Sequence, residues 1–244
     1  MHVLPAIDLL AGQAVRLHQG RYTDVTVYST DPPALAASLQ GKVPVLHVVD
    51  LEGARAGCAV QRALIREIIA AFGAPGDGGG VQVGGGVRSI QAVESYLELG
   101  AARVVLGTAA LRDPSQVRAA ASRFPGRLVV AVDARDGHVA VEGWAETSSR
   151  TALEVASWFA DAPIAALLYT DVARDGTRTG PNLEATRTLA AAVPIPVLAS
   201  GGVGSLDDLA ALARIPNVAG AIVGRALYER AFTLEEAITA ASFV

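Results

Sequence analysis

Two glycine-rich segments have the composition of phosphate-binding turns. They are GGGVRS (84–89) and SGGVGS (200–205), each between a β-like run and a helix-like run. Glycine lets the backbone approach an anion closely, and the first N–H groups of a helix have no partner within the helix. A second glycine turn follows each of them, GTAAL (107–111) and GRALY (224–228). One such turn is equally typical of a plain tight turn, but the symmetric pair favours two phosphate sites.

The predicted phosphate-binding residues follow directly from these turns. They are Gly84, Gly85, Gly86, Gly107, Thr108, Ser200, Gly201, Gly202, Gly224 and Arg225. Two such sites would suit a long substrate with a phosphate at each end.

Carboxylates at the ends of apolar runs are the second chemical signal. Asp8 and Asp133 each close a β-like run, and YTDVARDGTRTG (169–180) supplies Thr170 and Asp175. Burying a carboxylate is costly unless it is paired or used, and opposed carboxylates suit proton transfer. For Asp50 and Asp171, which lie in similar places, a helix cap or a loop ion pair is the simpler interpretation.

Other catalytic groups have no recognisable pattern. The four histidines, His2, His18, His47 and His138, are scattered without metal-ligand spacing, and Cys58 is the single cysteine. We therefore expect no metal and no disulfide.

Alternating apolar runs and helical patterns must position these residues. The predicted strands are 3–8, 44–50, 81–84, 103–107, 127–133, 165–171, 196–200 and 219–224. Helices are expected after the capping residues Asp31, Ser89, Asp113, Asn182, Ser205 and Thr233. Eight such units in this length predict an α/β fold, a (β/α)8 TIM barrel, with a doubly wound open sheet as the alternative.

The chain also repeats itself, which predicts two similar half-barrels, about 1–125 and 126–244, within a single domain, 1–244. Segment 83–111 parallels 199–228, PAIDL (5–9) parallels VAVDA (130–134), and LHVVD (46–50) parallels LYTDV (168–172).

Composition excludes several classes of partner. The 244 residues are 51% hydrophobic and 18% charged with a net charge of -4, so the chain offers no basic field for nucleic acid. The N-terminal stretch has no basic region before its apolar residues, and Thr188 to Leu206 is interrupted by prolines and glycines. We expect a cytoplasmic protein with no membrane segment and no obligate protein partner.

Several motifs together resemble one enzyme family. PAIDLLAGQAVRLHQG, VLHVVDLEGA, VQVGGGVRS, GWAE, YTDVARDGT, ASGGVGSLDDL and IVGRALYE are similar to the histidine-biosynthesis isomerases. These convert the phosphoribosylformimino derivative of aminoimidazole carboxamide ribotide to its phosphoribulosyl form by an Amadori rearrangement. The resemblance covers essentially the whole chain and implies a (β/α)8 barrel, no cofactor and a substrate with two phosphates.

The resemblance also implies residue roles. Asp8 would be the general base and Asp175 the general acid, with Asp133 and Thr170 assisting. Arg16 and Trp144 match positions that contact substrate, and Arg88 is a further candidate.

Three alternatives remain at this point. The related cyclase barrel of imidazole glycerol phosphate synthase shares the repeat, but its pattern has a lysine near Arg16 and lacks GWAE. Dual-substrate isomerases, which also accept phosphoribosylanthranilate, have an arginine before the Gly-Trp pair, where this chain has Glu142. A barrel that only binds phosphorylated metabolites would not need Asp8, Asp133 and Asp175 together.

Overall fold

Eight parallel strands close into a barrel in this computed structural model, which describes residues 1–18, 20–73 and 79–242. The barrel strands of this described part are β1 (His2–Leu10), β4 (Val45–Asp50), β5 (Gly80–Gly84), β6 (Arg103–Leu106), β7 (Leu128–Arg135), β10 (Ala166–Asp171), β11 (Val197–Ser200) and β12 (Val218–Val223). The last strand pairs with the first, His2 opposite Gly220, so the sheet has no free edge there. The (β/α)8 barrel is confirmed and the open sheet is excluded.

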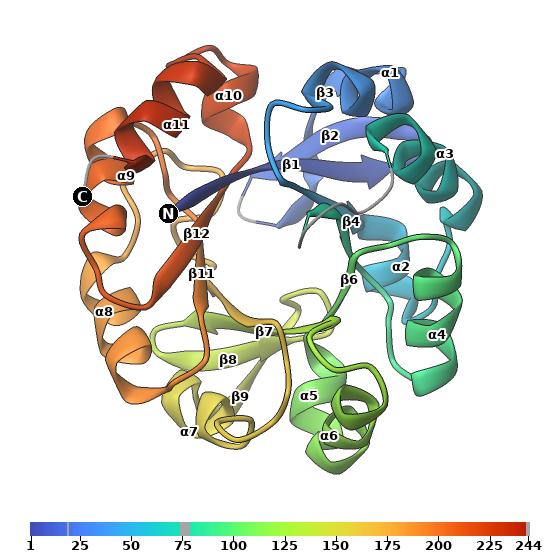
Figure 1. Cartoon of the computed structure of the whole chain (residues 1–244), viewed down its shortest axis with the longest axis vertical. Coiled ribbons are helices and arrows are strands. Elements are labelled where there is room, and N and C mark those ends of the chain that lie inside the picture. The colour runs from blue at the N-terminus through green and yellow to red at the C-terminus, as the bar shows by residue number, and fades with distance from the viewer. Residues whose placement is uncertain (19, 74–78, 243–244) are drawn as a thin grey trace.

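Helices form an outer ring around these strands (Figure 1). Their bounds are α1 (Pro32–Leu39), α2 (Leu51–Ala56), α3 (Arg62–Phe72), α4 (Ile90–Glu98), α5 (Thr108–Arg112), α6 (Pro114–Arg123), α7 (Ala152–Ser157), α8 (Leu183–Ala192), α9 (Leu206–Ala213), α10 (Arg225–Tyr228) and α11 (Leu234–Ser242). All six predicted capping residues accept a backbone N–H from their own helix, beginning with Asp31, Ser89, Asp113, Asn182 and Ser205. Thr233 does the same before α11, where its hydroxyl accepts from the N–H of Glu236.

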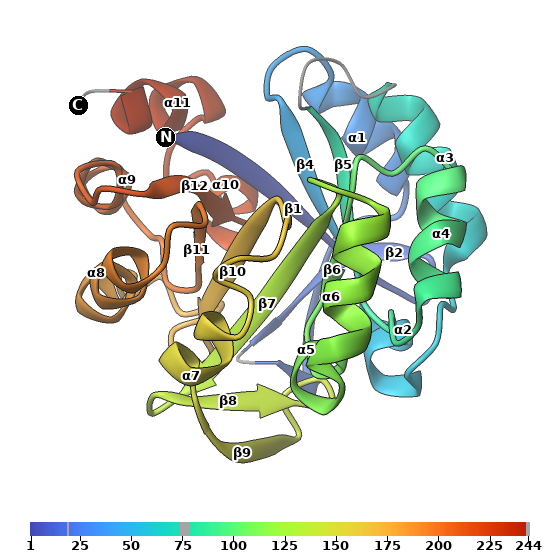
Figure 2. The same cartoon turned by 60° about the horizontal axis from the view of Figure 1, so that its bottom comes forward.

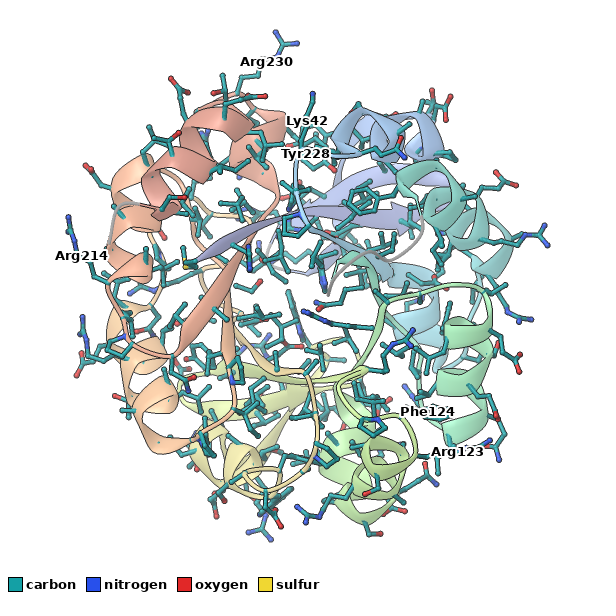
Figure 3. All side chains as sticks on the ribbon, viewed as in Figure 1. Lys42, Arg123, Phe124, Arg214, Tyr228 and Arg230 are labelled. Atoms are coloured by element: carbon teal, nitrogen blue, oxygen red, sulfur yellow. The ribbon has the colours of Figure 1, made fainter. Side chains whose placement is uncertain are left out.

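The apolar runs explain why the strands lie where they do. Parallel strands covered on both faces need apolar side chains on both. The inward-facing set fills the barrel, and it consists of Leu4, Ala6, Val45, Val105, Val129, Ala131, Ala166, Leu168, Leu198 and Ile222. The outward-facing set packs under the helices in a larger cluster that includes Ile7, Leu46 and Leu167. On the far side of the helices, Arg214 and Arg230 point away from the ring (Figure 3).

Two antiparallel hairpins extend the barrel and were not predicted. One is β2 (Gln13–His18) with β3 (Arg21–Ser29), after β1, and the other is β8 (His138–Val141) with β9 (Glu146–Thr151), after β7. Figure 2 shows β8 and β9 lying beyond the end of β7. Strands β3 and β9 are mostly exposed, so they lack the apolar signal that identified the barrel strands. Both hairpins follow equivalent strands of the two halves.

The internal repeat is visible in the backbone, with one correction of register. Val49 pairs with Asp8, and Thr170 pairs with Asp133, so Val49 and Thr170 are equivalent positions. Asp50 therefore corresponds to Asp171, and the segment equivalent to 46–50 is 167–171 rather than the 168–172 inferred from the letters. Within the described part of the chain, no helix is long and apolar enough to cross a membrane.

Candidate active site

Polar side chains gather at the end of the barrel where the parallel strands finish. A cavity of about 190 Å³ lies there, and its walls include Asp8 on β1, Asp133 on β7, Thr170 on β10, and Asp175 in the loop after β10. Loops at this end of such barrels carry the reacting groups because they surround one shared opening. The structure thus brings the predicted base and acid, Asp8 and Asp175, and the two residues predicted to assist them to one cavity.

Arg16 joins the two carboxylates that the sequence singled out. Its Nη1 donates to Oδ2 of Asp8 at 2.7 Å, and its Nη2 donates to Oδ1 of Asp175, also at 2.7 Å. The three side chains are each about nine-tenths buried. Strand β2 places Arg16 there, because the hairpin folds back antiparallel along β1, with Val15 opposite Asp8. Arg16 was predicted to contact substrate; in this structure its partners are the two carboxylates.

Burial and charge act against each other in this group. Burial raises the pKa of Asp8 above its ordinary value, Arg16 opposes that shift, and the charge of Asp175 adds to it. Burial would lower the pKa of Arg16, but Asp175 and Asp8 outweigh it and raise that pKa. One guanidinium between two carboxylates gives the cluster a net charge of about -1 when all three are ionised, so a proton binds Asp8 more readily than in water.

Asp133 is held by two donors from neighbouring elements. The indole Nε1 of Trp144 donates to its Oδ2 at 2.8 Å, and the hydroxyl of Thr170 also hydrogen-bonds to it. Burial raises the pKa of Asp133, and these two hydrogen bonds lower it in part. Trp144 lies against Gly20 of the other hairpin, where a Cβ would come within 2.5 Å of the indole ring. The two hairpins therefore meet over the cavity.

The first glycine turn forms part of the cavity wall. Gly84, Gly85, Gly86, Gly107 and Thr108 all line it. Gly85 has a φ of 101°, and a Cβ there would meet the carbonyl oxygen of Asp50 at 2.1 Å, so only glycine fits. Arg88 also lines the cavity, and its Nη2 donates to Glu142 at 2.6 Å.

The second glycine turn has a different relation to the cavity. Its first residue, Ser200, lies on the wall, whereas Gly201, Gly202, Gly224 and Arg225 are not among the lining residues. Gly224 packs against the guanidinium of Arg16, since a Cβ there would come within 3.0 Å of its Cζ. Arg225 donates to the carbonyl of Gly176 and to Glu229. The two turns are thus alike in backbone but differ in how they meet the cavity.

Sequence reasoning missed His47 and Gln82. His47 lines the cavity and is 6% exposed, and its Nδ1 lies 2.9 Å from Nε2 of the fully buried Gln82. Burial, with a smaller contribution from the charge of Arg16, lowers the pKa of His47 to about 3. A neutral ring that accepts from Gln82 at Nδ1 carries its proton on Nε2. A single histidine inside the apolar run VLHVV gave little signal, because such residues are typical of a hydrogen-bonded core.

The remaining predicted acids have structural roles. Asp50 accepts from the N–H of Gly53 and caps α2, and Asp171 accepts from the N–H of Ala173 and from Nδ2 of Asn182. Both follow the simpler interpretation given above. Among the described residues, no group of three or more His, Cys, Asp or Glu side chains is placed to hold a metal ion.

Comparison with known proteins gives a consistent result. The profile of a family described as histidine biosynthesis protein matches residues 2–233. A protein of Sorangium cellulosum is 69% identical over 242 residues, which cover 99% of this chain and 100% of its own. Proteins of Acidiphilium cryptum (51%, 92% of each chain) and Syntrophus aciditrophicus (48%, 99% of each chain) are also similar. All three are named 1-(5-phosphoribosyl)-5-((5-phosphoribosylamino)methylideneamino)imidazole-4-carboxamide isomerase.

Proposed function

Because this chain belongs to the histidine biosynthesis protein family, we propose that its barrel mouth is the active site for the aldose to ketose isomerisation of a ribotide with a phosphate at each end. The chain is an isomerase of histidine biosynthesis, given its identity over nearly the full length with the relatives named above. The cyclase alternative is not favoured, because those relatives are named isomerases.

The observation that carries the residue assignment is the placement of Asp8 and Asp175. They come from different parts of the chain and bind the same guanidinium at the cavity wall. An isomerisation of this kind needs one group that donates a proton and one that removes a proton, both close to the same sugar. Two carboxylates on one cavity meet that requirement.

In the proposed reaction, Asp175 donates a proton to the ribose ring oxygen. The C1–O bond breaks, and the lone pair of the exocyclic nitrogen forms a C=N bond, which gives an open-chain Schiff base. Asp8 then removes the C2 proton, and the C–H electron pair forms a C1=C2 bond as the cationic nitrogen takes up the former C=N pair. Protonation of C1 and loss of the C2 hydroxyl proton complete the ketose, so no atom is gained or lost.

Arg16 sets a condition on this sequence of steps. Its Nη2 occupies Oδ1 of Asp175, so Asp175 would donate its proton from its other oxygen or after this bond is exchanged. An anionic substrate offers Arg16 another partner. Substrate binding would then release Asp175 for its role as an acid, while Asp8 stays ionised as the base.

The other site residues are assigned to binding. The first glycine turn and Thr108 would hold one phosphate, and Ser200 with the second turn would hold the other. Trp144 would stack on the imidazole ring and Asp133, held by Trp144 and Thr170, would bind the sugar.

The decisive experiment is to incubate the purified protein with the formimino ribotide, without ammonia or any glutaminase, and to follow absorbance together with separation of the two ribotides. Conversion to the phosphoribulosyl isomer is expected. Binding without conversion would contradict the proposal and leave only a binding role. Formation of an imidazole glycerol phosphate from the phosphoribulosyl isomer and added ammonia would instead indicate the cyclase.

A further inference from the structure

Glu142 joins the loop between β8 and β9 to the first half of the barrel. Its Oε2 accepts from Nη2 of Arg88 at 2.6 Å, and its Oε1 lies 2.7 Å from Nη2 of Arg112 on α5. Its backbone N–H donates to the hydroxyl oxygen of Thr108 at 3.0 Å. The Glu142 side chain is four-fifths buried and that of Arg88 about two-thirds buried, so the contact between them is more shielded from water than an ordinary surface pair, whereas Arg112 is mostly exposed.

The backbone of residues 142–144 has an unfavourable conformation that these contacts stabilise. Glu142, Gly143 and Trp144 all have left-handed φ values, 55°, 63° and 70°. For the two residues other than glycine this conformation costs free energy, and it persists only where surrounding contacts determine it. Trp144 is held at the other end of the segment, by its indole N–H on Asp133 and by Nη2 of Arg135 on its carbonyl.

These contacts form a continuous path across the cavity. It runs from Arg88 and Thr108 at the first glycine turn, through Glu142, to Trp144 and then Asp133. Because a hydroxyl oxygen can accept one hydrogen bond while its own proton is donated elsewhere, Thr108 can hold Glu142 and an anion at the same time. The position of the indole is thus tied to the turn that would bind a phosphate.

The other half of the barrel contains a related arrangement in which the carboxylate lies next to the short helix and not on the hairpin. In the internal repeat, Thr108 and Arg112 of α5 correspond to Arg225 of α10 and to Glu229, which directly follows that helix. Glu229 there binds Arg225, Arg178 and the hydroxyl of Tyr28 on strand β3. In each half, a carboxylate among arginines fastens a hairpin to the short helix after the preceding strand.

We propose that Glu142 is a positioning residue that couples the first glycine turn to Trp144, holding the indole on Asp133 and over the ring of the substrate. The inference rests on the proposed function for the substrate, but the coupling itself is a property of the free protein. Glu142 touches no reacting atom; it acts through Arg88, Arg112 and the loop.

The test uses Trp144 as its own reporter. In a Trp158→Phe background Trp144 is the single tryptophan, so quenching of its emission by neutral acrylamide measures its exposure. Glu142→Gln keeps the size of the side chain and removes the charge that binds both arginines. We expect the quenching constant to rise about twofold, and KM for the ribotide to rise about tenfold with kcat within about threefold, as for the loss of one charged contact.

Two further variants keep the proposal falsifiable. Arg112→Met removes one partner of Glu142 that lies outside the predicted phosphate sites. It should raise the quenching constant less than Glu142→Gln does. The double variant should have the same quenching constant as Glu142→Gln alone. Glu94→Gln is the matched control, because Glu94 pairs with Arg123 on the outer face, where Figure 3 labels the arginine, and it should change neither readout.

The outcomes separate this inference from the proposed function. An unchanged quenching constant in Glu142→Gln, or an equal change in Glu94→Gln, would overturn the coupling. A merely structural role would lower the free energy of unfolding without moving quenching or KM, and would also contradict it. The quenching measurement does not depend on turnover. If the parent protein fails to convert the ribotide, the proposed function is refuted, but the quenching constants still test the role of Glu142.

Discussion

Asp8 and Asp175 are joined through one cation, each 2.7 Å from a different terminal nitrogen of Arg16. The pair therefore cannot be treated as two independent acids, because any change at one alters the charge balance felt by the other. Three charged side chains with two negative charges and one positive charge are buried together, and the resulting excess of negative charge determines how substitutions at the site should behave.

Asp8→Asn is expected to remove proton abstraction while improving stability. The loss in kcat should be about 10² to 10⁴, the usual range for a general acid or base, with affinity for a bisphosphate ligand nearly unchanged. The substitution also leaves Arg16 and Asp175 as a neutral pair.

The pKa of Asp8 is raised above its ordinary value of 3.8, so its contribution to stability is present below about pH 4 and is lost as pH rises. The free energy of unfolding of the variant should therefore increase relative to that of the parent as pH rises. Denaturant unfolding at a series of pH values and kcat measured side by side test this; near-normal turnover would remove Asp8 from the mechanism.

Arg16→Met should destabilise the protein by about 3 to 5 kcal/mol, because it leaves two buried carboxylates without their cation. Combining it with Asp8→Asn should recover much of that loss, since one unpaired negative charge disappears. A double-mutant cycle of unfolding free energies measures the coupling. Additive effects of the two substitutions would show that the cluster does not behave as one charged unit.

His47→Gln should make the protein less sensitive to acid. Burial lowers the pKa of His47 to about 3 from its ordinary 6.5, so its contribution is fully present above about pH 6.5 and is lost as pH falls. Between about pH 7.5 and pH 5 the parent should lose about 2 kcal/mol of unfolding free energy through this one residue, by linkage. The variant should lack that part of the decline. Parallel pH profiles for the two proteins would contradict the buried neutral state of the imidazole.

The two phosphate turns are better tested through hydroxyls than through glycines. Gly85 and Gly201 have positive φ, and a Cβ would come within 2.1 Å and 2.6 Å of the backbone oxygens of Asp50 and Asp171, so larger residues there would disrupt the turns themselves. Thr108→Val and Ser200→Ala should instead each weaken binding of a bisphosphate ligand by about 1 to 2 kcal/mol. A ligand with a single phosphate should respond to one of the two variants. Equal losses with every ligand would indicate that neither hydroxyl contacts a phosphate.

We expect little or no activity on phosphoribosylanthranilate, the second substrate of dual isomerases. A free acid at position 142, where the dual isomerases have an arginine, would repel its carboxylate, but the structure shows Glu142 bound to Arg88 and Arg112. The carboxylate would instead have to compete with Glu142 for those cations. Complementation of a strain without the anthranilate isomerase measures this, and robust growth without tryptophan would refute it.

Local patterns in the sequence were sufficient to predict the barrel strands and the starts of the helices. Apolar runs identified the eight barrel strands, and side chains such as Asp31 and Ser205 identified where helices begin, because both signals lie within a few residues of what they determine. The placement of Asp8 and Asp175 at one opening followed from the barrel, since all parallel strands end on the same side.

The contacts that organise the site could not be predicted in the same way. The bond between Arg16 and Asp175 joins residues far apart in the chain, and it depends on a hairpin whose outer strand is polar and exposed. The sequence around Glu142 does not reveal its partners, because Arg88 and Arg112 belong to the other half of the barrel. The place of these residues in the sequence does not indicate which distant side chains they will contact in the fold.

The exchanged charges of Arg112 and Glu229 mean that the two halves are not interchangeable parts. A protein assembled from two copies of the second half would bring Glu142 of one copy against Glu229 of the other, with glycine at position 204 in place of Arg88. Two carboxylates would then face each other where the natural chain has a carboxylate between two arginines. The contact of Glu142 with Arg88 and Arg112 therefore depends on residues in which the two similar segments differ.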